Sequence, residues 1–357
     1  MKVVHITPTY FDPTSIIGGG ERYAMELAKA MSEIAETELI SFSDRPRVEK
    51  AGSLIMRLLK PWFYIKGQKT TPFCPQFLSL IAGADIIHCY QYHTLTTSLS
   101  ILFGKLLRKK VFVTDLGGGG WDILSYRVPM GNFIDGFIHI SEYSKKIFSQ
   151  YRTRHYVVYG GADTKKFFPL GLTREKKVLF VGRLLPHKGV NYLIDAIDNE
   201  IPLTIISTSF IPEYFEYLKK IAIGKKVEFI TGCNNETLLR EYNTASVLVL
   251  PSVYKTIYGK CTIAPELLGL VVLEAMACKT PVIVTDVDGL PEIVKDGETG
   301  FVVSPNNSSE LRNKMYALIN NPQEIHKMGE AAYNLFLEKF TWDKTVEKVL
   351  KAYQDAL

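Results

Sequence analysis

The feature that most constrains this chain is a repeated alternation between short apolar runs and longer amphipathic segments. The apolar runs have the length and composition of strands buried on both faces, and they cover residues 2–7, 37–43, 84–89, 110–114, 178–181, 203–207 and 227–230. Between them, apolar residues recur every three or four positions, which predicts helices. With 357 residues, the alternation predicts an α/β fold of two doubly wound, Rossmann-like parallel sheets that face a cleft.

The composition excludes several other classes of protein. A hydrophobic content of 46% and a charged content of 22% are typical of a soluble globular chain. No apolar run reaches the roughly 18 residues of a membrane-spanning helix, and the first residues lack the apolar core of a signal peptide. Five dispersed cysteines favour a reducing compartment, and a net charge of +5 without a nucleic-acid motif gives no sign of a nucleic-acid partner. We therefore expect a cytoplasmic location.

The stretch PELLGLVVLEAMACKTP, residues 265–281, carries two glutamates with seven residues between them. A helix is expected to begin near residues 268–270, and a helix start can hold a phosphate through its free N–H groups and its dipole. Glu266 then lies in the loop ahead of the helix and Glu274 more than one turn inside it. A buried carboxylate needs hydrogen-bond donors, and sugar hydroxyls are suitable. The alternative is that Glu274 faces water or pairs with a lysine.

Two cations follow a predicted strand of the second half of the chain. Arg183 and Lys188 leave the carboxyl end of the strand at residues 178–181, where open α/β sheets bind ligands. An arginine fork and a lysine point charge together suit a diphosphate. The alternative is a pair of ordinary surface cations.

Glycine-rich turns follow two strands of the first half. Gly18, Gly19 and Gly20 lie between the first strand and its helix, where bare backbone can approach a phosphate or sugar, although a flexible turn would use the same residues. Four more glycines begin at Gly117, just after Asp115, and mark a second site edge. His93, after the preceding strand, is a candidate sugar or acceptor contact or a structural histidine.

A basic and aromatic stretch lies in the first half. Between residues 50 and 84 the chain has five basic residues and no acidic one before Asp85, interleaved with apolar residues and with Trp62 and Tyr64. Such a mixture suits an anionic membrane surface, chiefly through residues 50–70. The alternative is a core helix with a solvated basic face.

In their order and spacing, these segments resemble retaining GT-B glycosyltransferases of family 4, also described as glycosyl transferases group 1. The resemblance spans nearly the whole chain and rests on Gly18–Arg22, on residues 161–169, on Gly182-Arg183 followed by Lys188-Gly189, on Glu266 and Glu274 around Gly269-Leu270-Val271, and on Gly289-Leu290-Pro291-Glu292. It implies domains at residues 1–165 and 166–338, with a helix at 339–357 that crosses back to the first domain. The first domain would bind the acceptor and the second the nucleotide sugar.

The resemblance implies a role for each matching residue. Arg183 and Lys188 would neutralise a diphosphate, Glu266 would hold sugar hydroxyls, and Glu274 would accept from both ribose hydroxyls. The remaining implied donor-binding residues are Gly18, Gly19, Gly20, Gly232, Leu268, Gly269, Leu270 and Val271. His93, Asp115 and Gly117 are possible sugar or acceptor contacts.

The expected activity is metal-independent transfer of a hexose with retention. The donor would be a nucleotide diphosphate sugar, with a UDP-sugar favoured, and no cofactor is expected because the nucleotide sugar is a co-substrate. The acceptor would be a glycan or lipid-linked sugar of cell-envelope, glycolipid or N-glycan assembly, met at the inner face of a membrane. Many family members have a histidine where this chain has Leu116. The alternatives are a nucleotide-sugar epimerase of the same fold or a non-catalytic nucleotide-sugar-binding subunit.

Overall fold

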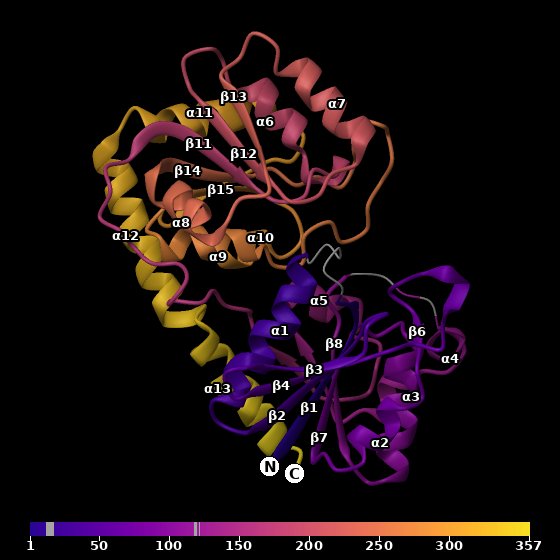
Figure 1. The fold of residues 1–357 in the computed structure, drawn as a ribbon. Helices are drawn as coiled ribbons and strands as arrows, with labels where there is room; N and C mark the ends of the chain where they lie inside the picture. The colour runs from indigo at the N-terminus through magenta and orange to yellow at the C-terminus, as the bar shows by residue number, and fades with distance from the viewer. Residues whose placement is uncertain (12–17, 118–119, 121) are drawn as a thin grey trace. The chain divides into compact units, whose positions relative to one another are not determined.

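The structure, a computed structural model, describes residues 1–11, 18–117, 120 and 122–357. They form two compact units: unit 1 holds Met1–Gly160 and Trp342–Leu357, and unit 2 holds Gly161–Thr341 (Figure 1). The sequence placed the two crossings near residues 165 and 338. Both lie a few residues from there, because Ala162 and Thr341 form a β-bridge and the Ala162 N–H donates to the Phe340 carbonyl at 3.0 Å, which ties both crossing segments into unit 2.

Unit 1 is built on an eight-stranded sheet with the order β10-β9-β8-β7-β1-β2-β4-β3. Its strands are β1 (Lys2–Tyr10), β2 (Glu36–Phe42), β3 (Arg47–Ala51), β4 (Leu54–Leu59), β7 (Ile86–Tyr90), β8 (Lys110–Thr114), β9 (Gly136–His139) and β10 (His155–Val157). The pairings are parallel, except that the edge strand β3 runs antiparallel to β4. β5 (Phe63–Tyr64) and β6 (Pro72–Phe73) form a separate antiparallel pair.

Helices cover both faces of this sheet. They are α1 (Gly19–Ser32), α2 (Phe77–Ile81), α3 (Leu95–Leu106), α4 (Ile123–Arg127), α5 (Glu142–Ile147) and α13 (Trp342–Gln354), with 3-10 turns η1 (Ile65–Gly67) and η2 (Met130–Phe133). α1 packs against α13, whereas α2 and α3 pack together on the other side (Figure 1). Successive strand side chains alternate in direction. Ile87 and Cys89 therefore join the apolar core under α2 and α3, while His88 turns to the opposite face and bonds Tyr353 of α13.

The expectation of a core helix in the basic and aromatic stretch is wrong, because its apolar run at residues 54–59 forms β4 of the β3–β4 hairpin. Leu54, Met56 and Leu58 are buried at alternate positions, which is the period of a strand. Arg57, which lies between them, pairs with Glu38 of β2. Over so short a run, the same apolar residues fit the period of a helix as well as that of a strand. The pairing with β2 decides in favour of the strand.

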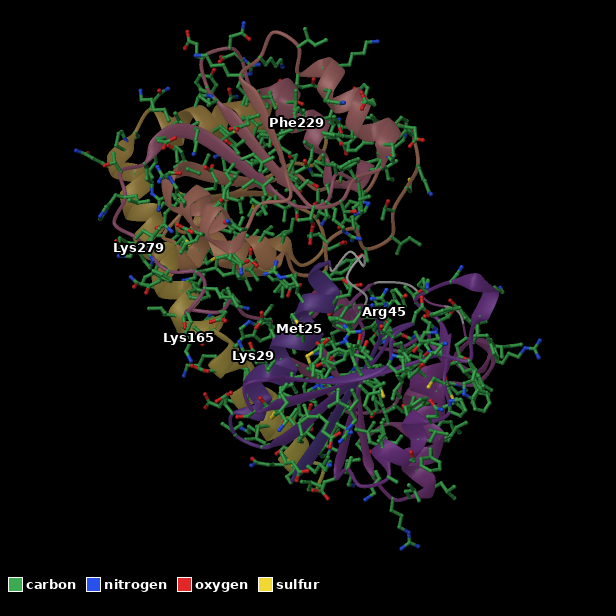
Figure 2. All side chains as sticks on the ribbon, in the orientation of Figure 1. Met25, Lys29, Arg45, Lys165, Phe229 and Lys279 are labelled. Carbon is green, nitrogen blue, oxygen red and sulfur yellow. The ribbon has the colours of Figure 1, made fainter. Side chains whose placement is uncertain are left out.

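Unit 2 is built on a six-stranded sheet with the order β13-β12-β11-β14-β15-β16, all parallel. Its strands are β11 (Glu175–Val181), β12 (Leu203–Ser207), β13 (Val227–Thr231), β14 (Ala245–Leu250), β15 (Val282–Thr285) and β16 (Gly300–Val303). Its helices are α6 (Val190–Ala196), α7 (Pro212–Ile221), α8 (Asn235–Thr244), α9 (Leu270–Ala277), α10 (Leu290–Ile293), α11 (Ser308–Ile319) and α12 (Pro322–Lys339), with the 3-10 turn η3 (Pro186–Lys188). Side chains fill the space between sheet and helices, as Phe229 of β13 does where its ring meets Phe215 of α7 (Figure 2).

Both sheets reverse their strand order at one point. In unit 2 the chain runs outward from β11 through β12 to β13 on one side, and from β14 through β15 to β16 on the other. In unit 1 the same reversal lies between β1 and β7. The carboxyl ends of the strands at such a switch point are the usual ligand site of an open α/β sheet. Within the described part of the chain, no helix combines the length and apolarity needed to cross a bilayer.

Candidate functional site

The switch point of unit 2 brings together the two cations that the sequence singled out and the first of its two glutamates. Lys188, at the end of η3 after β11, forms an ion pair with Glu266, which lies just ahead of α9. Ser252, two residues after β14, donates its hydroxyl to the same carboxylate oxygen at 3.2 Å. The Lys188 and Glu266 side chains are only 12% and 13% exposed. A half-buried, hydrogen-bonded ion pair therefore stands between the ends of β11 and β14.

Arg183 lies on the same loop as Lys188 but in a different environment. Its side chain is exposed, and it makes no ion pair within the residues that the structure describes. Between the two cations, burial lowers the pKa of His187 to about 4, and the charge of Lys188 acts in the same direction. The loop thus carries an exposed guanidinium, a paired ammonium and, at pH 7, a neutral imidazole.

Two glycines fix the approach of the loops. Gly189 has a φ of 65°, and a Cβ there would lie 1.9 Å from the Pro251 carbonyl oxygen, so only glycine lets the β11 loop touch the end of β14. Gly269 precedes α9 with a φ of 86°, and a Cβ there would lie 2.7 Å from Leu290. The N–H groups of Leu270 and Val271 begin the helix after it, and the buried Leu268 anchors the approach.

Glu274 is inside α9, as expected, and is 1% exposed. Its carboxylate accepts a hydrogen bond of 2.7 Å from the hydroxyl of Tyr242, which is itself fully buried. The expectation that Glu274 faces water is therefore wrong. A buried carboxylate held by a tyrosine hydroxyl is oriented before any ligand arrives.

Arg174 holds the frame around this pair. It donates to the carbonyls of Ala245 at 2.7 Å and of Lys279 at 2.7 Å, and it also reaches the carbonyls of Tyr242 and Cys278. Lys279, labelled in Figure 2, follows the end of α9, so Arg174 caps that helix with a cation. Burial lowers the pKa of Arg174 to about 10, so it stays charged at neutral pH.

Gly232 lies on the same edge of the sheet but farther from the switch point. It follows β13, which is two strands away from β11, and its φ of 77° makes the turn. Its N–H donates to the Ser207 carbonyl at 3.1 Å. The structure thus groups Arg183, Lys188 and Glu266 at the switch point and places Gly232 at the carboxyl end of the outermost strand.

The switch point of unit 1 gathers glycines and neutral rings. Gly18 is the N-cap of α1, Gly19 and Gly20 begin the helix, and a Cβ on Gly20 would lie 3.2 Å from that of Leu116. Asp115 ties the ends of β7 and β8, because its carboxylate accepts from the N–H groups of Tyr92 at 2.8 Å and Gly117 at 2.9 Å. The remaining predicted glycines of this turn, Gly118 and Gly119, lie outside the described residues.

His93 lies at the end of β7 in the same region. Its ring stacks on Tyr126 of α4 with centroids 4.6 Å apart and planes 7° apart, and its Nδ1 is 3.1 Å from the Ser125 hydroxyl. Burial lowers the pKa of His93, against the opposing charges of Asp115 and Asp122. The site therefore offers a neutral imidazole and a partly exposed aromatic ring, which suit a sugar better than a phosphate.

Sequence reasoning missed several residues that build the two sites. Ser252, Tyr242 and Arg174 carry no motif of their own; Ser252 had one signal, since it follows the end of an apolar run. Asp122 had a clearer one, because an aspartate directly before an apolar run is a typical N-cap. It is buried and caps α4 by accepting from the N–H groups of Leu124 and Ser125.

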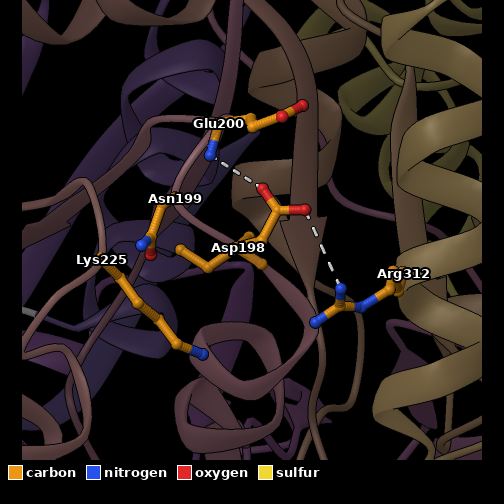
Figure 3. A pocket seen from close by; sticks show the side chains of 6 residues that line it. Asp198, Asn199, Glu200, Lys225 and Arg312 are labelled. Carbon is orange, nitrogen blue, oxygen red and sulfur yellow. Dashed lines mark hydrogen bonds and ion pairs between the residues drawn. The ribbon is translucent and has the colours of Figure 1, made fainter.

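A separate surface pocket of unit 2 lies at the amino ends of the strands, opposite the switch-point site, and does not contain the cations and glutamates of that site. It is lined by Ile197, Asp198, Asn199, Glu200, Lys225 and Arg312 (Figure 3). Asp198 pairs with Arg312 at 3.9 Å and accepts from the Glu200 N–H at 2.9 Å. Among the described residues, no three His, Cys, Asp or Glu side chains gather as metal ligands would.

Comparisons with known proteins agree over nearly the whole chain. Residues 162–335 match the family model described as glycosyl transferases group 1, and residues 17–166 match the model described as glycosyltransferase family 4. An uncharacterised glycosyltransferase of Methanocaldococcus jannaschii is 25% identical over 100% of this chain and 99% of its own length. A D-inositol 3-phosphate glycosyltransferase of Streptomyces bingchenggensis is 26% identical over 100% of this chain and 89% of its own.

Solved structures of glycosyltransferases share the fold. Sucrose-phosphate synthase from Thermosynechococcus elongatus superposes with a TM-score of 0.76 at 22% identity, over 99% of this chain and 98% of that one. The Anabaena protein HepE in complex with UDP and glucose superposes with a TM-score of 0.76 at 18% identity, over 99% of this chain and 100% of that one. The two parallel-sheet domains and these neighbours identify the fold as GT-B.

Proposed function

The chain belongs to the family 4 glycosyltransferases of GT-B fold, and from that premise we propose that it transfers a hexose from a UDP-sugar to a glycan or lipid-linked acceptor with retention of configuration. The observation that carries the proposal is the grouping of Arg183, Lys188, Glu266 and the start of α9 at one switch point. Each of these features has a partner in a nucleotide diphosphate sugar. The uridine base is supported by the neighbour solved with UDP and glucose.

The diphosphate would lie between the loop after β11 and the start of α9. Arg183 is exposed and offers its planar fork, and Lys188 offers a point charge close by. The N–H groups of Leu270 and Val271 point along the helix dipole toward the same anion. We propose that the reaction needs no metal or cofactor, because these groups supply the positive charge.

Bond breaking would increase the charge that these groups stabilise. As the glycosidic bond breaks, the leaving phosphate gains negative charge, so Arg183 and Lys188 act mainly in the transition state. Lys188 would exchange its bond to Glu266 for a phosphate oxygen, which leaves the Glu266 carboxylate to accept from sugar hydroxyls. The acceptor would attack from the side that the phosphate leaves, and the phosphate would take the acceptor proton.

The ribose would be held by Glu274. Tyr242 donates to one of its oxygens at 2.7 Å and fixes the orientation of the carboxylate. The backbone at Gly232 lies at the carboxyl end of β13 and would meet the base. A neutral His93 on an aromatic neighbour would contact the sugar or acceptor in unit 1, with Asp115 and Gly117 at the same edge.

Calorimetric titration with UDP and then GDP tests the donor class directly. We expect UDP to bind and Glu274→Ala to weaken that binding about tenfold or more, since a buried hydrogen-bonded group is lost. Glu338→Ala, an exposed glutamate of α12, is the matched control and should bind as the wild type does. Binding of GDP alone would replace the uridine assignment. Binding of neither nucleotide would reject the donor site.

The acceptor side of the proposal includes a membrane surface met by residues 50–70. Two exposed aromatic side chains support this part of the proposal: Trp62 is 65% exposed and Phe63 is 55% exposed, beside the exposed Lys60 and Lys66. Two cations of the stretch are already neutralised, because Arg57 pairs with Glu38 and Lys69 with Asp44. We propose a peripheral protein at the cytoplasmic face of a membrane, in cell-envelope, glycolipid or N-glycan assembly.

Sedimentation with phosphatidylglycerol vesicles at low salt tests the membrane surface. Wild-type protein should sediment, and the Trp62→Ala, Phe63→Ala double variant should not, since both side chains would insert at the interface. Ile263→Ala, which removes a 91% exposed side chain of unit 2, is the control. Equal sedimentation of the double variant and the wild type would remove residues 50–70 from the proposal.

A further inference from the structure

An arm of unit 2 between β14 and α9 has an internal structure of its own. Lys255 and Cys261 form an antiparallel bridge, the Thr256 N–H donates to the Lys260 carbonyl at 2.9 Å, and the Thr262 N–H donates to the Tyr254 carbonyl at 2.8 Å. This arm, residues 253–265, begins beside Ser252 and ends at Glu266. It therefore connects two residues of the proposed donor site by a hydrogen-bonded hairpin, not by a loose loop.

The first residues of the arm are also fixed to their surroundings at two points. The Val253 N–H donates to the His187 carbonyl at 2.8 Å, next to Lys188. On the other side the Asn306 amide donates to the Lys255 carbonyl at 3.0 Å, after β16. Tyr254 is thereby held near the loop that follows β15, even though its ring is 38% exposed.

A relay runs from Tyr254 to Glu266 through Asp288. The Asp288 N–H donates to the Tyr254 hydroxyl at 2.9 Å, and the Asp288 carboxylate accepts from the Glu266 N–H at 2.8 Å. The Gly289 N–H donates in turn to the Glu266 carbonyl at 3.2 Å. The backbone N–H and the backbone carbonyl of Glu266 are thus both hydrogen-bonded, while its carboxylate is held by Lys188 and Ser252.

Asp288 adopts a conformation that points to a specific role. Its φ is 50°, in the left-handed region that residues other than glycine rarely adopt. Strain of this kind persists where the surroundings enforce it, and it is common at functional sites. Here it directs the carboxylate to the Glu266 N–H and the Asp288 N–H to Tyr254.

We propose that Tyr254 and Asp288 are positioning residues for Glu266, so that the arm sets the geometry of sugar transfer without touching the nucleotide. The inference rests on the proposed function for its catalytic consequence. Loss of the Tyr254 hydroxyl would release Asp288, and loss of Asp288 would release the Glu266 backbone. Both changes would lower kcat and leave the affinity for UDP as it is.

The test compares Tyr254→Phe, Asp288→Gly and Asp288→Asn with Tyr258→Phe, a control on the same arm whose ring is 58% exposed. UDP release from UDP-glucose is followed at varied substrate concentration. Tyr254→Phe should lower kcat about tenfold, the worth of one well-placed hydrogen bond, with KM and UDP affinity within about twofold. Asp288→Gly keeps the left-handed backbone and should lower kcat further, whereas Asp288→Asn, which can still accept from Glu266, should recover most of it.

A double variant distinguishes positioning from simple stability. If the relay is one unit, Tyr254→Phe should add nothing to Asp288→Gly. Additive losses, or a Tyr254→Phe rate equal to that of Tyr258→Phe, would overturn the proposal. A lower melting temperature with an unchanged kcat would also overturn it, because it would leave a structural role only.

Hydrogen exchange keeps this test separate from the proposed function. The backbone amide of Glu266 should exchange faster in Asp288→Gly and in Tyr254→Phe than in Tyr258→Phe, whether or not a nucleotide binds. A wild type that binds no UDP would reject the donor site while the exchange rates still report on the relay. Equal exchange in all variants would overturn the relay even in an active enzyme.

Discussion

The two switch points of this molecule lie at the same kind of reversal in strand order but carry different chemistry. In unit 2 the strand ends present Arg183, Lys188 and Glu266, so the site is charged. In unit 1 they present glycines around α1 and a neutral His93 on Tyr126, with Asp115 already engaged by backbone N–H groups. The topology therefore fixes where a ligand binds, and the residues just beyond the strands decide what it is.

The interiors of the two units differ in a related way. Under α1 and α13, unit 1 buries His5 and His88 beside Tyr90, with a His5–Tyr90 hydrogen bond of 2.8 Å. Unit 2 buries a carboxylate, Glu274, against a tyrosine. The interior of unit 1 thus contains buried histidines that must stay neutral, whereas the interior of unit 2 contains a buried carboxylate that is held by a hydrogen-bond donor. This difference predicts distinct responses to pH and to mutation.

Acid should produce the largest difference between the units. Burial lowers the pKa of His5 and of His139 to about 3 and lowers that of His88 well below its usual value. Below pH 6.5 the unfolded chain then binds more protons at these histidines than the folded chain does. Their contribution to the free energy of unfolding is therefore fully present above pH 6.5 and is lost as the pH drops toward 3. His5 and His139 should each cost about 2 kcal/mol at pH 5, and His88 and His93 of unit 1 act in the same direction, whereas the corresponding histidine of unit 2 is His187.

Urea unfolding at pH 7 and pH 5 measures this difference. All three tryptophans fall within the residue ranges of unit 1, so their fluorescence follows unit 1 while circular dichroism follows both units. The fluorescence midpoint should fall more on acidification, and His5→Gln should reduce its pH dependence. His326→Gln, at a 79% exposed side chain, is the control. Equal shifts of both probes would contradict the assignment of acid sensitivity to unit 1.

Loss of the exposed cation at the switch point of unit 2 should have the next largest effect. Arg183→Ala should lower kcat/KM about a hundredfold, close to 3 kcal/mol, because it removes the donor that we propose for the leaving phosphate. Its side chain is exposed, so the melting temperature should not change. Arg312→Ala, a cation of the opposite sheet edge (Figure 3), should leave the rate as it is. A near-normal rate for Arg183→Ala would reject its catalytic assignment.

The contrast between the units also explains which parts of the fold were predictable. The β11 and β12 strands and α9 were found because a fully buried parallel strand is a continuous apolar run and because a helix start after a left-handed Gly269 leaves a local signal. The β3–β4 hairpin was missed, since the apolar residues around Leu54, Met56 and Leu58 fit a helix period as well as a strand period, and only the pairing with β2 decides between them. Local patterns suffice where burial is two-sided and fail where a partner strand decides.

The sites follow the same division. Glu274 stood out because a carboxylate inside an apolar helix is costly to bury without donors, and Arg183, Lys188 and Glu266 stood out because they follow predicted strands or precede the helix where the family 4 pattern has them. Tyr242 and Arg174 did not, because a tyrosine in an amphipathic helix and an arginine before a strand are ordinary in sequence. Their roles depend on contacts between segments far apart in the chain, such as the Tyr242–Glu274 bond across 32 positions.

A pair of tyrosine variants should sharpen the comparison of the interiors. Tyr242→Phe leaves the Glu274 carboxylate without its hydroxyl donor and should cost about 2 kcal/mol, as for a hydrogen bond to a charged group. Tyr353→Phe breaks a 2.6 Å bond to His88 between neutral groups and should cost about 1 kcal/mol. Urea unfolding at pH 7 measures both. A cost for Tyr353→Phe equal to that of Tyr242→Phe would show that the two interiors do not differ in this way.

The smallest effect should come from the neutral site of unit 1. His93→Ala removes a ring that stacks on Tyr126 at 4.6 Å and whose pKa burial keeps low, so it would remove the proposed contact to the sugar or acceptor but no charge. We expect kcat/KM for the acceptor to fall about fivefold, near 1 kcal/mol, with UDP affinity unchanged. Initial rates at varied acceptor concentration and calorimetry with UDP measure the two terms separately. His93→Gln, which keeps a polar group, should lose less. An equal loss of UDP affinity would place His93 on the donor side, and the division between a charged site for the nucleotide and a neutral site for the acceptor would then fail.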